Sequence, residues 1–484
     1  MAEHVDAVLR NATIYDGTGV PPFQGDVAFS GDRIVTILRK GESTRLTGDQ
    51  ELDCQGFAVA PGFIDAHTHD DRIVLDAPDT LPKISQGVTT VVVGNCGISL
   101  APVQFENDPP PPMNLLGGRE AFQFASFGAY ASRLKATPPS VNVAALVGHS
   151  ALRLRVQKDV GQKASPAEIK AMLSLADESM ASGAAGFSTG LFYPTNAAAD
   201  RDEVAQIASR FAAHGGVYAT HMRDEFNRVL DSIDETLATA KEAHIPVIVS
   251  HHKCAGPQNW GRTKETLNVL ETASETQDVN LDVYPYTAGS TNLRADLVTA
   301  DYRIQITWSK PHPEMTGRDL AGIAKEWKCD LQEAARRLDP AGAIYFQMAE
   351  EDVRRVMGSR LAMIGSDGLP HDKHPHPRLW GTFPRVIGHY ARDIALFSVH
   401  VAIHKMTGLT ARVFRIKDRG VLKVGAYADI VVFNPATIND RATYDSPQLQ
   451  SVGIDKVFVN GRLSFERKQG VVARAGRLVG GNNS

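Results

Sequence analysis

Cysteine is scarce in this 484-residue chain, and its four cysteines (Cys54, Cys96, Cys254 and Cys329) stand singly. The sequence therefore has neither a disulfide framework nor a CxxC zinc knuckle. It also lacks GxGxxG and GxxxxGK[ST] loops, which argues against the common nucleotide-binding folds. Lysines and arginines are interspersed with acids at a net charge of −4, so we expect no nucleic-acid partner.

Long apolar segments are missing as well. No stretch reaches the roughly 18 uninterrupted apolar residues of a membrane span, and residues 1–9 lack the basic and apolar regions of a signal peptide. The composition, 43% hydrophobic and 22% charged, is that of a globular protein with a large core. We expect a cytoplasmic protein that handles a small molecule and has no membrane partner. The sequence does not indicate its oligomeric state.

Short β-rich apolar runs recur along the middle of the chain, and most are followed by a segment with helical periodicity. One such helix is expected over residues 166–182, because Ser165 and Glu168 form the sequence pattern of a capping box. The alternation predicts a parallel sheet flanked by helices. Eight runs favour a (β/α)8 TIM barrel over an open sheet. They span residues 57–66, 87–93, 141–147, 185–188, 216–220, 245–250, 279–284 and 361–365.

Both ends of the chain differ from this pattern, since they alternate apolar and polar residues and contain many turn residues. We predict that residues 1–61 and 416–484 together form one small β domain, a sandwich or barrel. Residues 62–415 would then form the (β/α)8 barrel. Within it, residues 287–342 are too long for an ordinary connection, which predicts an insertion over the barrel mouth.

Polar residues follow the predicted strands, at the barrel end where catalytic groups lie. His67 and His69 can point to the same face of a strand, and single residues of metal-binding type follow three further runs, namely His221, His251 and Asp367, while the second run ends in Cys96. Histidine and cysteinate are the usual zinc ligands, so this set predicts a metal site. Asp367 is the candidate acid and base, because a carboxylate beside a dication stays ionised and can accept a proton from water.

Two further residues near these runs leave alternatives open. His149 follows the third run and is either a structural histidine or part of the site. Cys254 lies just past the sixth run, and a packed structural role is the expected one for it and for Cys54.

Longer motifs resemble the amidohydrolase superfamily, namely residues 61–69 (PGFIDAHTH), 365–368 (GSDG) and 425–432 (GAYADIVV). A second set resembles the N-acyl-D-amino-acid deacylases, or D-aminoacylases, of that superfamily, and comprises residues 87–99 (GVTTVVVGNCGIS), 186–193 (GFSTGLFY), 220–225 (THMRDE), 249–253 (VSHHK) and 376–383 (HPRLWGTF). The resemblance covers nearly the whole chain. It implies zinc-dependent hydrolysis of N-acyl-D-amino acids to a carboxylate and a free D-amino acid.

The resemblance also divides the metal ligands. Many amidohydrolases bridge two metals with a lysine after the fourth strand, but residues 186–190 contain none. In the D-aminoacylase branch a cysteine matching Cys96 takes that place. We therefore expect one tightly bound zinc on Cys96, His221 and His251, and a weaker second position at His67 and His69.

Substrate contacts follow from the same resemblance. Lys253, Tyr284, Ser290 and Arg378 match positions that bind the α-carboxylate, and Arg378 offers a two-pronged fork where Lys253 offers a point charge. Tyr193 matches a residue that helps to polarise the scissile carbonyl.

The preference for the substrate side chain stays open between two readings. An apolar pocket could be built from Phe192, Tyr345 and Met348, whereas Arg294 could reach in from the insertion and pair an acidic side chain. Residues 253–261 and 306–314 resemble the N-acyl-D-glutamate deacylases more closely, which favours the acidic reading.

Two other functions compete with the deacylase. A cyclic-amide hydrolase of the hydantoinase or dihydroorotase type would share fold and metal chemistry, but it usually needs the bridging lysine. A non-catalytic ligand binder is the second rival, because a fold does not determine a function. A full ligand set together with Asp367 is more than binding requires.

Overall fold

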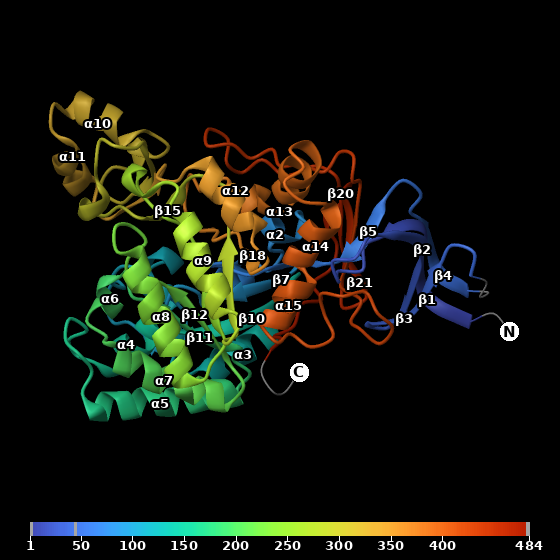
Figure 1. The fold of residues 1–484 in the computed structure, drawn as a ribbon, viewed down its shortest axis with the longest axis horizontal. Helices are drawn as coiled ribbons and strands as arrows, with labels where there is room; N and C mark the ends of the chain where they lie inside the picture. Colours follow the sequence, from blue (N-terminus) through green and yellow to red (C-terminus); the bar gives the residue numbers. More distant parts are fainter. Residues whose placement is uncertain (1–2, 43–45, 481–484) are drawn as a thin grey trace.

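The computed structural model describes residues 3–42 and 46–480, and its centre is a parallel barrel (Figure 1). Neighbouring barrel strands pair in parallel in the order β18-β14-β13-β12-β11-β10-β7-β6. The ring closes between its first and last members, since the Ala66 N–H donates to the Ile364 carbonyl at 3.1 Å and the Asp367 N–H to the His67 carbonyl at 2.7 Å. The predicted fold class is confirmed. The strands are β6 (Phe63–Asp65), β7 (Val88–Val93), β10 (Asn142–Gly148), β11 (Gly186–Gly190), β12 (Val217–His221), β13 (Val247–Val249), β14 (Val279–Val283) and β18 (Ala362–Ile364).

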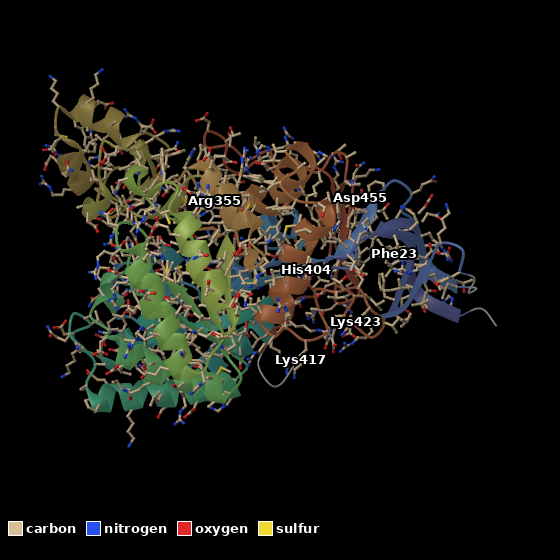
Figure 2. All side chains as sticks on the ribbon, in the orientation of Figure 1. Phe23, Arg355, His404, Lys417, Lys423 and Asp455 are labelled. Atoms are coloured by element: carbon tan, nitrogen blue, oxygen red, sulfur yellow. The ribbon has the colours of Figure 1, made fainter. Side chains whose placement is uncertain are left out.

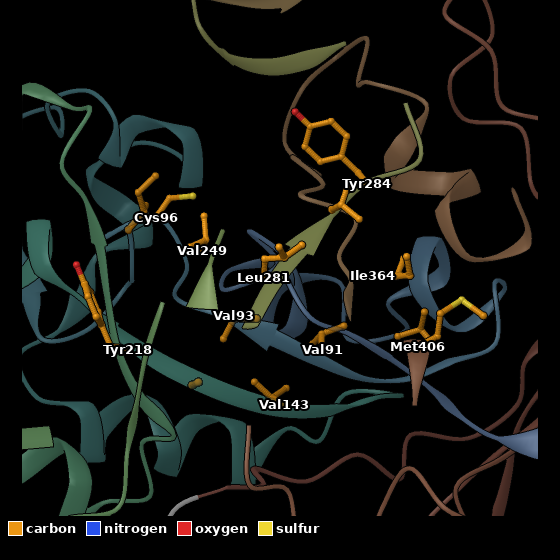
Figure 3. Packing of buried hydrophobic residues seen from close by; sticks show 14 of the residues in the cluster. Val91, Val93, Cys96, Val143, Tyr218, Val249, Leu281, Tyr284, Ile364 and Met406 are labelled. Atoms are coloured by element: carbon orange, nitrogen blue, oxygen red, sulfur yellow. The ribbon is translucent and has the colours of Figure 1, made fainter. Parts of the chain in front are cut away.

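Amphipathic helices cover the outside of the barrel, with α5, α7, α8 and α9 following one another around it (Figure 1). The capping box at α5 forms as expected, because Ser165 accepts from the Glu168 N–H and Glu168 accepts from the Ser165 N–H. Inside, the strands bury aliphatic side chains, and Figure 3 shows Val91, Val93 and Leu281 packed below Cys96 and Tyr284. The main helices are α3 (Phe127–Ala136), α4 (His149–Val156), α5 (Pro166–Ala181), α7 (Arg201–Ala213), α8 (Val229–Ala243), α9 (Thr263–Ala273), α12 (Glu350–Gly358), α13 (Arg378–Arg385), α14 (Val399–Met406) and α15 (Gly408–Val413).

A second sheet of nine strands draws on both ends of the chain. Its two halves join where β5 pairs antiparallel with β19. Figure 1 places β1 to β4 at the side of the molecule farthest from the green barrel helices. The boundaries at residues 61/62 and 415/416 stay predictions. The strands are β1 (Glu3–Ile14), β2 (Phe23–Ser30), β3 (Arg33–Arg39), β4 (Leu46–Asp53), β5 (Ala58–Pro61), β19 (Ile430–Phe433), β20 (Ile454–Val459), β21 (Arg462–Glu466) and β22 (Gly470–Val471).

The first predicted run, residues 57–66, is two strands rather than one. Strand β5 belongs to the nine-stranded sheet and β6 to the barrel, and Gly62 separates them. A Cβ at Gly62 would lie 2.1 to 2.6 Å from three side-chain atoms of Thr89, so a larger residue does not fit there without movement. A continuous apolar run hides this change of sheet, because both strands are buried.

The expected insertion forms a small layer of its own. Strands β15 (Gly289–Asn292), β17 (Ala341–Tyr345) and β16 (Ile304–Ser309) pair antiparallel in that order, and helices α10 (Leu320–Trp327) and α11 (Leu331–Leu338) pack beside them. A separate apolar cluster that includes Ile306, Ile323 and Ala343 holds this layer together. Ser290 and Tyr345 of this sheet line the cavity at the barrel mouth.

Charged side chains such as Lys417 and Lys423 project from the outside of the molecule (Figure 2). Among residues 3–42 and 46–480, no helix combines the length and the apolar character that crossing a bilayer requires.

Candidate active site

Six polar side chains from five barrel strands meet at the carboxyl end of the barrel, and all are buried. His67 and His69 follow β6, and Cys96 follows β7, whereas His221 ends β12. His251 and Asp367 follow β13 and β18. Three of these residues adopt left-handed backbone, with φ of 55° at Cys96, 37° at His251 and 49° at Asp367. Such strain costs about 1–3 kcal/mol per residue and is typical of functional sites.

The six residues form two overlapping groups of possible metal ligands. His67, His69, Cys96 and Asp367 make one group, and Cys96, His221 and His251 make the other. Within each group all ligand atoms lie within 4.8 Å of one another. Cys96 belongs to both, and its Sγ lies 3.2 Å from His67 Nε2 and 3.3 Å from His251 Nε2.

The donor chemistry of the second group fits zinc. Burial lowers the pKa of His221 and of His251 well below the usual value, so both imidazoles are neutral and offer a lone pair. Neither ring nitrogen of His221 has a hydrogen-bond partner within the described part of the chain. Burial raises the pKa of the Cys96 thiol to about 11, and a bound cation is what favours its thiolate. One sulfur and two imidazole nitrogens are a typical zinc ligand set.

Asp367 lies between the first histidine pair and a buried arginine. Its Oδ1 is 3.2 Å from His69 Nε2, and its Oδ2 is 3.0 Å from Arg378 Nη1. Burial by itself would raise the pKa of Asp367, but the charges of Arg378 and His67 and a hydrogen bond from His69 hold it well below its usual range. Asp367 is therefore an ionised carboxylate beside the proposed metal ligands.

A cavity opens above these residues, and most of the expected substrate contacts line it. The wall includes Cys96, His69, His221, His251 and Asp367 together with Phe192, Tyr193, Lys253, Tyr284, Ser290 and Tyr345. Four further apolar side chains line it, namely Leu115, Phe226, Leu297 and Leu369, and so do the polar side chains of Glu225, Thr291 and Gln347.

Three expected contacts lie off this wall. Arg378 is fully buried behind Tyr284, with its guanidinium carbon 4.5 Å from the ring centroid. Met348 lines a separate small cavity that it shares with Cys254. Arg294 contacts the cavity residue Phe192 instead of lining the cavity, with its guanidinium carbon 4.0 Å from the ring centroid.

Two carboxylates that the sequence did not point to contact the histidines of the site, and one of them, Glu225, also lines the cavity. Glu225 Oε1 lies 3.0 Å from His251 Nδ1 and accepts from Lys253 Nζ at 2.6 Å. Asp282 accepts from the His251 N–H at 2.9 Å, and its other oxygen lies 3.2 Å from His67 Nδ1. Carboxylates in these places fix the orientation and tautomer of a ligating imidazole. The signal available in the sequence was an acid inside an apolar strand, as at Asp282.

A buried lysine beneath the site was also missed. Lys83 Nζ donates to Asp65 at 2.9 Å and to the Ser366 hydroxyl at 2.6 Å. Although burial alone would lower the pKa of Lys83, Asp65 and Asp70 raise it above its usual value. The contact ties the end of β6 to the turn after β18, which carries Asp367.

His149 and Cys254 lie outside the cavity. His149 Nε2 is 3.0 Å from the Glu203 carboxylate, a contact that holds α4 against α7. Burial raises the pKa of the Cys254 thiol to about 12, which keeps it protonated. These positions fit structural roles for both residues.

Comparison with known proteins agrees with this geometry. The sequence pattern of the amidohydrolase family matches residues 50–332 and 321–465. D-aminoacylase from Alcaligenes xylosoxydans xylosoxydans is 49% identical over 474 residues, which covers 98% of this chain and 97% of the relative. N-acyl-D-glutamate deacylase from Bordetella bronchiseptica, solved with zinc and a phosphonate inhibitor that mimics the tetrahedral intermediate, superimposes with a TM-score of 0.94 at 44% identity. That match covers 99% of this chain and 100% of the other.

L-Hydantoinase from Arthrobacter aurescens is a more distant structural relative. It covers 98% of this chain and 100% of its own, with a TM-score of 0.59 at 16% identity, and so shows the fold alone.

Proposed function

Because the chain belongs to the amidohydrolase family, we propose that it hydrolyses the linear amide of N-acyl-D-amino acids, releasing a carboxylate and a free D-amino acid. The observation that carries this proposal is one cavity that joins a sulfur and imidazole ligand set to an ionised Asp367 and to Lys253. The similarity to D-aminoacylase over almost the full length of both chains supports the same reaction.

Zinc is the proposed cofactor. Cys96, His221 and His251 would hold it tightly, and His67 and His69 would line the weaker second position beside Asp367. Zinc in such a site supplies a Lewis acid that polarises the acyl carbonyl and lowers the pKa of water. The solved N-acyl-D-glutamate deacylase contains zinc, in keeping with this assignment.

The proton transfers fall to Asp367. Its carboxylate accepts a proton from the attacking water and then gives that proton to the leaving nitrogen. Arg378 keeps it ionised before the reaction, through the 3.0 Å contact between Nη1 and Oδ2. Tyr193 lines the same cavity, and its phenol would donate to the developing oxyanion.

The substrate carboxylate would bind to a cation and hydroxyl groups of the cavity wall. Lys253, Tyr284 and Ser290 line the cavity, and Glu225 fixes the Lys253 ammonium. Arg378 would support this set from behind Tyr284, because its guanidinium packs on that ring and its Nε has no hydrogen-bond partner within the described residues. A cation beside two hydroxyl donors is suited to a carboxylate.

A panel of N-acetylated D- and L-amino acids, run with metal analysis of the purified protein, tests the proposal. We expect hydrolysis of D-substrates with zinc bound and little hydrolysis of L-substrates. If the protein hydrolyses none of these amino-acid derivatives, or hydrolyses hydantoin and dihydroorotate instead of them, the proposed function is refuted. The cytoplasmic location and the absence of a nucleic-acid partner stay predictions from the sequence.

A further inference from the structure

The insertion places one arginine beside the cavity but turns its charged end away. The Arg294 backbone is fixed there, because its N–H donates to Tyr345 Oη at 3.0 Å, and Tyr345 lines the cavity. The guanidinium packs on the ring of Phe192, which also lines the cavity and stacks on the metal-ligand candidate His221 with ring centroids 5.0 Å apart. One aromatic ring therefore connects Arg294 to the centre of the site.

Asp296 occupies the fork of Arg294. Arg294 Nε donates to Asp296 Oδ1 at 3.0 Å, and Nη2 donates to Asp296 Oδ2 at 2.7 Å. The remaining nitrogen, Nη1, donates to the Phe192 carbonyl at 3.0 Å. This two-pronged geometry is the one in which arginine binds a free carboxylate. A carboxylate of the chain thus occupies the guanidinium that a substrate with an acidic side chain would need.

We propose, on the basis of the deacylase function above, that Asp296 is an internal competitor for Arg294. By holding the guanidinium, it makes the enzyme select N-acyl-D-amino acids with apolar side chains over those with acidic ones. Leu115, Phe226 and Leu297 give the cavity wall an apolar part that suits this preference, beside the polar Thr291 and Gln347, and Arg294 does not line the wall.

Proximity in the chain favours the internal partner. Asp296 is two residues from Arg294, so it acts at a high effective concentration that a dissolved substrate does not match. Asp296 is also charged at neutral pH: partial burial would raise its pKa, but the hydrogen bond and charge of Arg294 hold it below the usual value. An acidic substrate must therefore displace Asp296 before it can use the fork.

The decisive variant is Asp296→Asn, which keeps the shape and removes the charge. Asp296 is exposed, with 59% of its side chain accessible, so the fold does not depend on it. We expect the ratio of kcat/KM for N-acetyl-D-glutamate to that for N-acetyl-D-leucine to rise about two- to fivefold, mainly through a lower KM for the acidic substrate. Asp296→Ser is a second variant with the same expected direction.

Two controls separate this effect from a change in the fold. Asp301→Asn alters an exposed acid of the same insertion for which residues 3–42 and 46–480 provide no ion pair, and should leave the ratio unchanged. Adding Arg294→Met to Asp296→Asn should remove the gain, because the freed fork is then absent.

The possible outcomes are distinct. A wild-type enzyme that prefers N-acetyl-D-glutamate to N-acetyl-D-leucine would overturn the inference, and so would an unchanged ratio in Asp296→Asn and Asp296→Ser. If no N-acetyl-D-amino acid is hydrolysed by the wild type, the proposed function fails and this inference falls with it.

Discussion

Asp367 and Arg378 form a buried pair whose charge state suits proton transfer. The arginine stabilises the carboxylate without removing it from the cavity, since Asp367 lines the wall and Arg378 lies behind Tyr284. Asp367→Asn should therefore lower kcat by about 10²- to 10⁴-fold, the range typical of a lost general acid and base. The measurement is initial rate on an N-acetyl-D-amino acid.

Metal analysis provides the control for this variant. Asparagine retains an oxygen at the same place, so zinc on Cys96, His221 and His251 should stay near the wild-type content. Undiminished turnover in Asp367→Asn would remove Asp367 from the mechanism, whereas lost zinc would assign it a ligand role instead.

Cys96 should matter more for zinc than the His67 and His69 pair. It is the residue shared by both ligand groups, and its sulfur lies within 3.3 Å of a histidine nitrogen from each. We expect Cys96→Ala to lose most of its zinc and the double variant His67→Ala/His69→Ala to lose less, as measured by zinc per chain after gel filtration. The reverse order would place the tight site at the histidine pair.

Single residues were predictable from the sequence where they follow a strand and belong to a metal-binding type. His221, His251 and Asp367 were found in that way, whereas Cys96 was assigned from the family resemblance. Glu225 and Asp282 were not found, because their roles depend on His251 and His67, which other strands supply. The orientation of the Arg294 side chain could not be predicted either, since no sequence pattern shows that the Asp296 carboxylate binds its guanidinium.

At the scale of elements, Lys83 joins β6 to the turn after β18, because it pairs with two aspartates near β6 and donates to the Ser366 hydroxyl in that turn. Lys83 is 1% exposed, and Asp65 and Asp70 are its partners at 2.9 and 3.5 Å. Removing one member of such a buried set costs about 3–5 kcal/mol, because it leaves a charge without compensation. Lys83→Met should therefore lower the urea midpoint of unfolding strongly.

Lys170→Met is the matched control, since Lys170 is an exposed residue of α5. It should leave the midpoint unchanged. Adding Asp65→Asn to Lys83→Met should recover part of the loss. Equal midpoints for Lys83→Met and the wild type would show that the charges in this set do not stabilise the closed barrel.

The barrel strands themselves were predictable, because each is a short apolar run bounded by turn residues. Where one run passes between two sheets at Gly62, the apolar pattern continues without interruption, so the break came from the structure alone. The strand pairing within the insertion could not be predicted from the sequence, because β15 pairs with β17 across about 50 residues of chain.

For the molecule as a whole, the proposed zinc site joins separate parts of the barrel. Cys96 follows β7, His221 ends β12 and His251 follows β13, so one ion would connect three strands that do not all pair with one another. A ligand that binds the folded state alone stabilises it by about 2.7 kcal/mol when its concentration is 100 times its Kd. Removing zinc with a chelator should therefore lower the Tm, and adding zinc back should restore it.

The chelated protein also tests whether the buried imidazole of His221 lowers the stability of the fold when no metal binds it. His221 has two buried ring nitrogens for which the described residues provide no hydrogen-bond partner, a state that costs stability without a ligand. The Tm of Cys96→Ala should already be low and should respond less to the chelator than that of the wild type, because its ligand set is incomplete. Scanning calorimetry measures the Tm of zinc-loaded and of chelated wild-type protein. Equal values would mean that the barrel holds its geometry without the ion, and that Glu225, Asp282 and Lys83 preform the site.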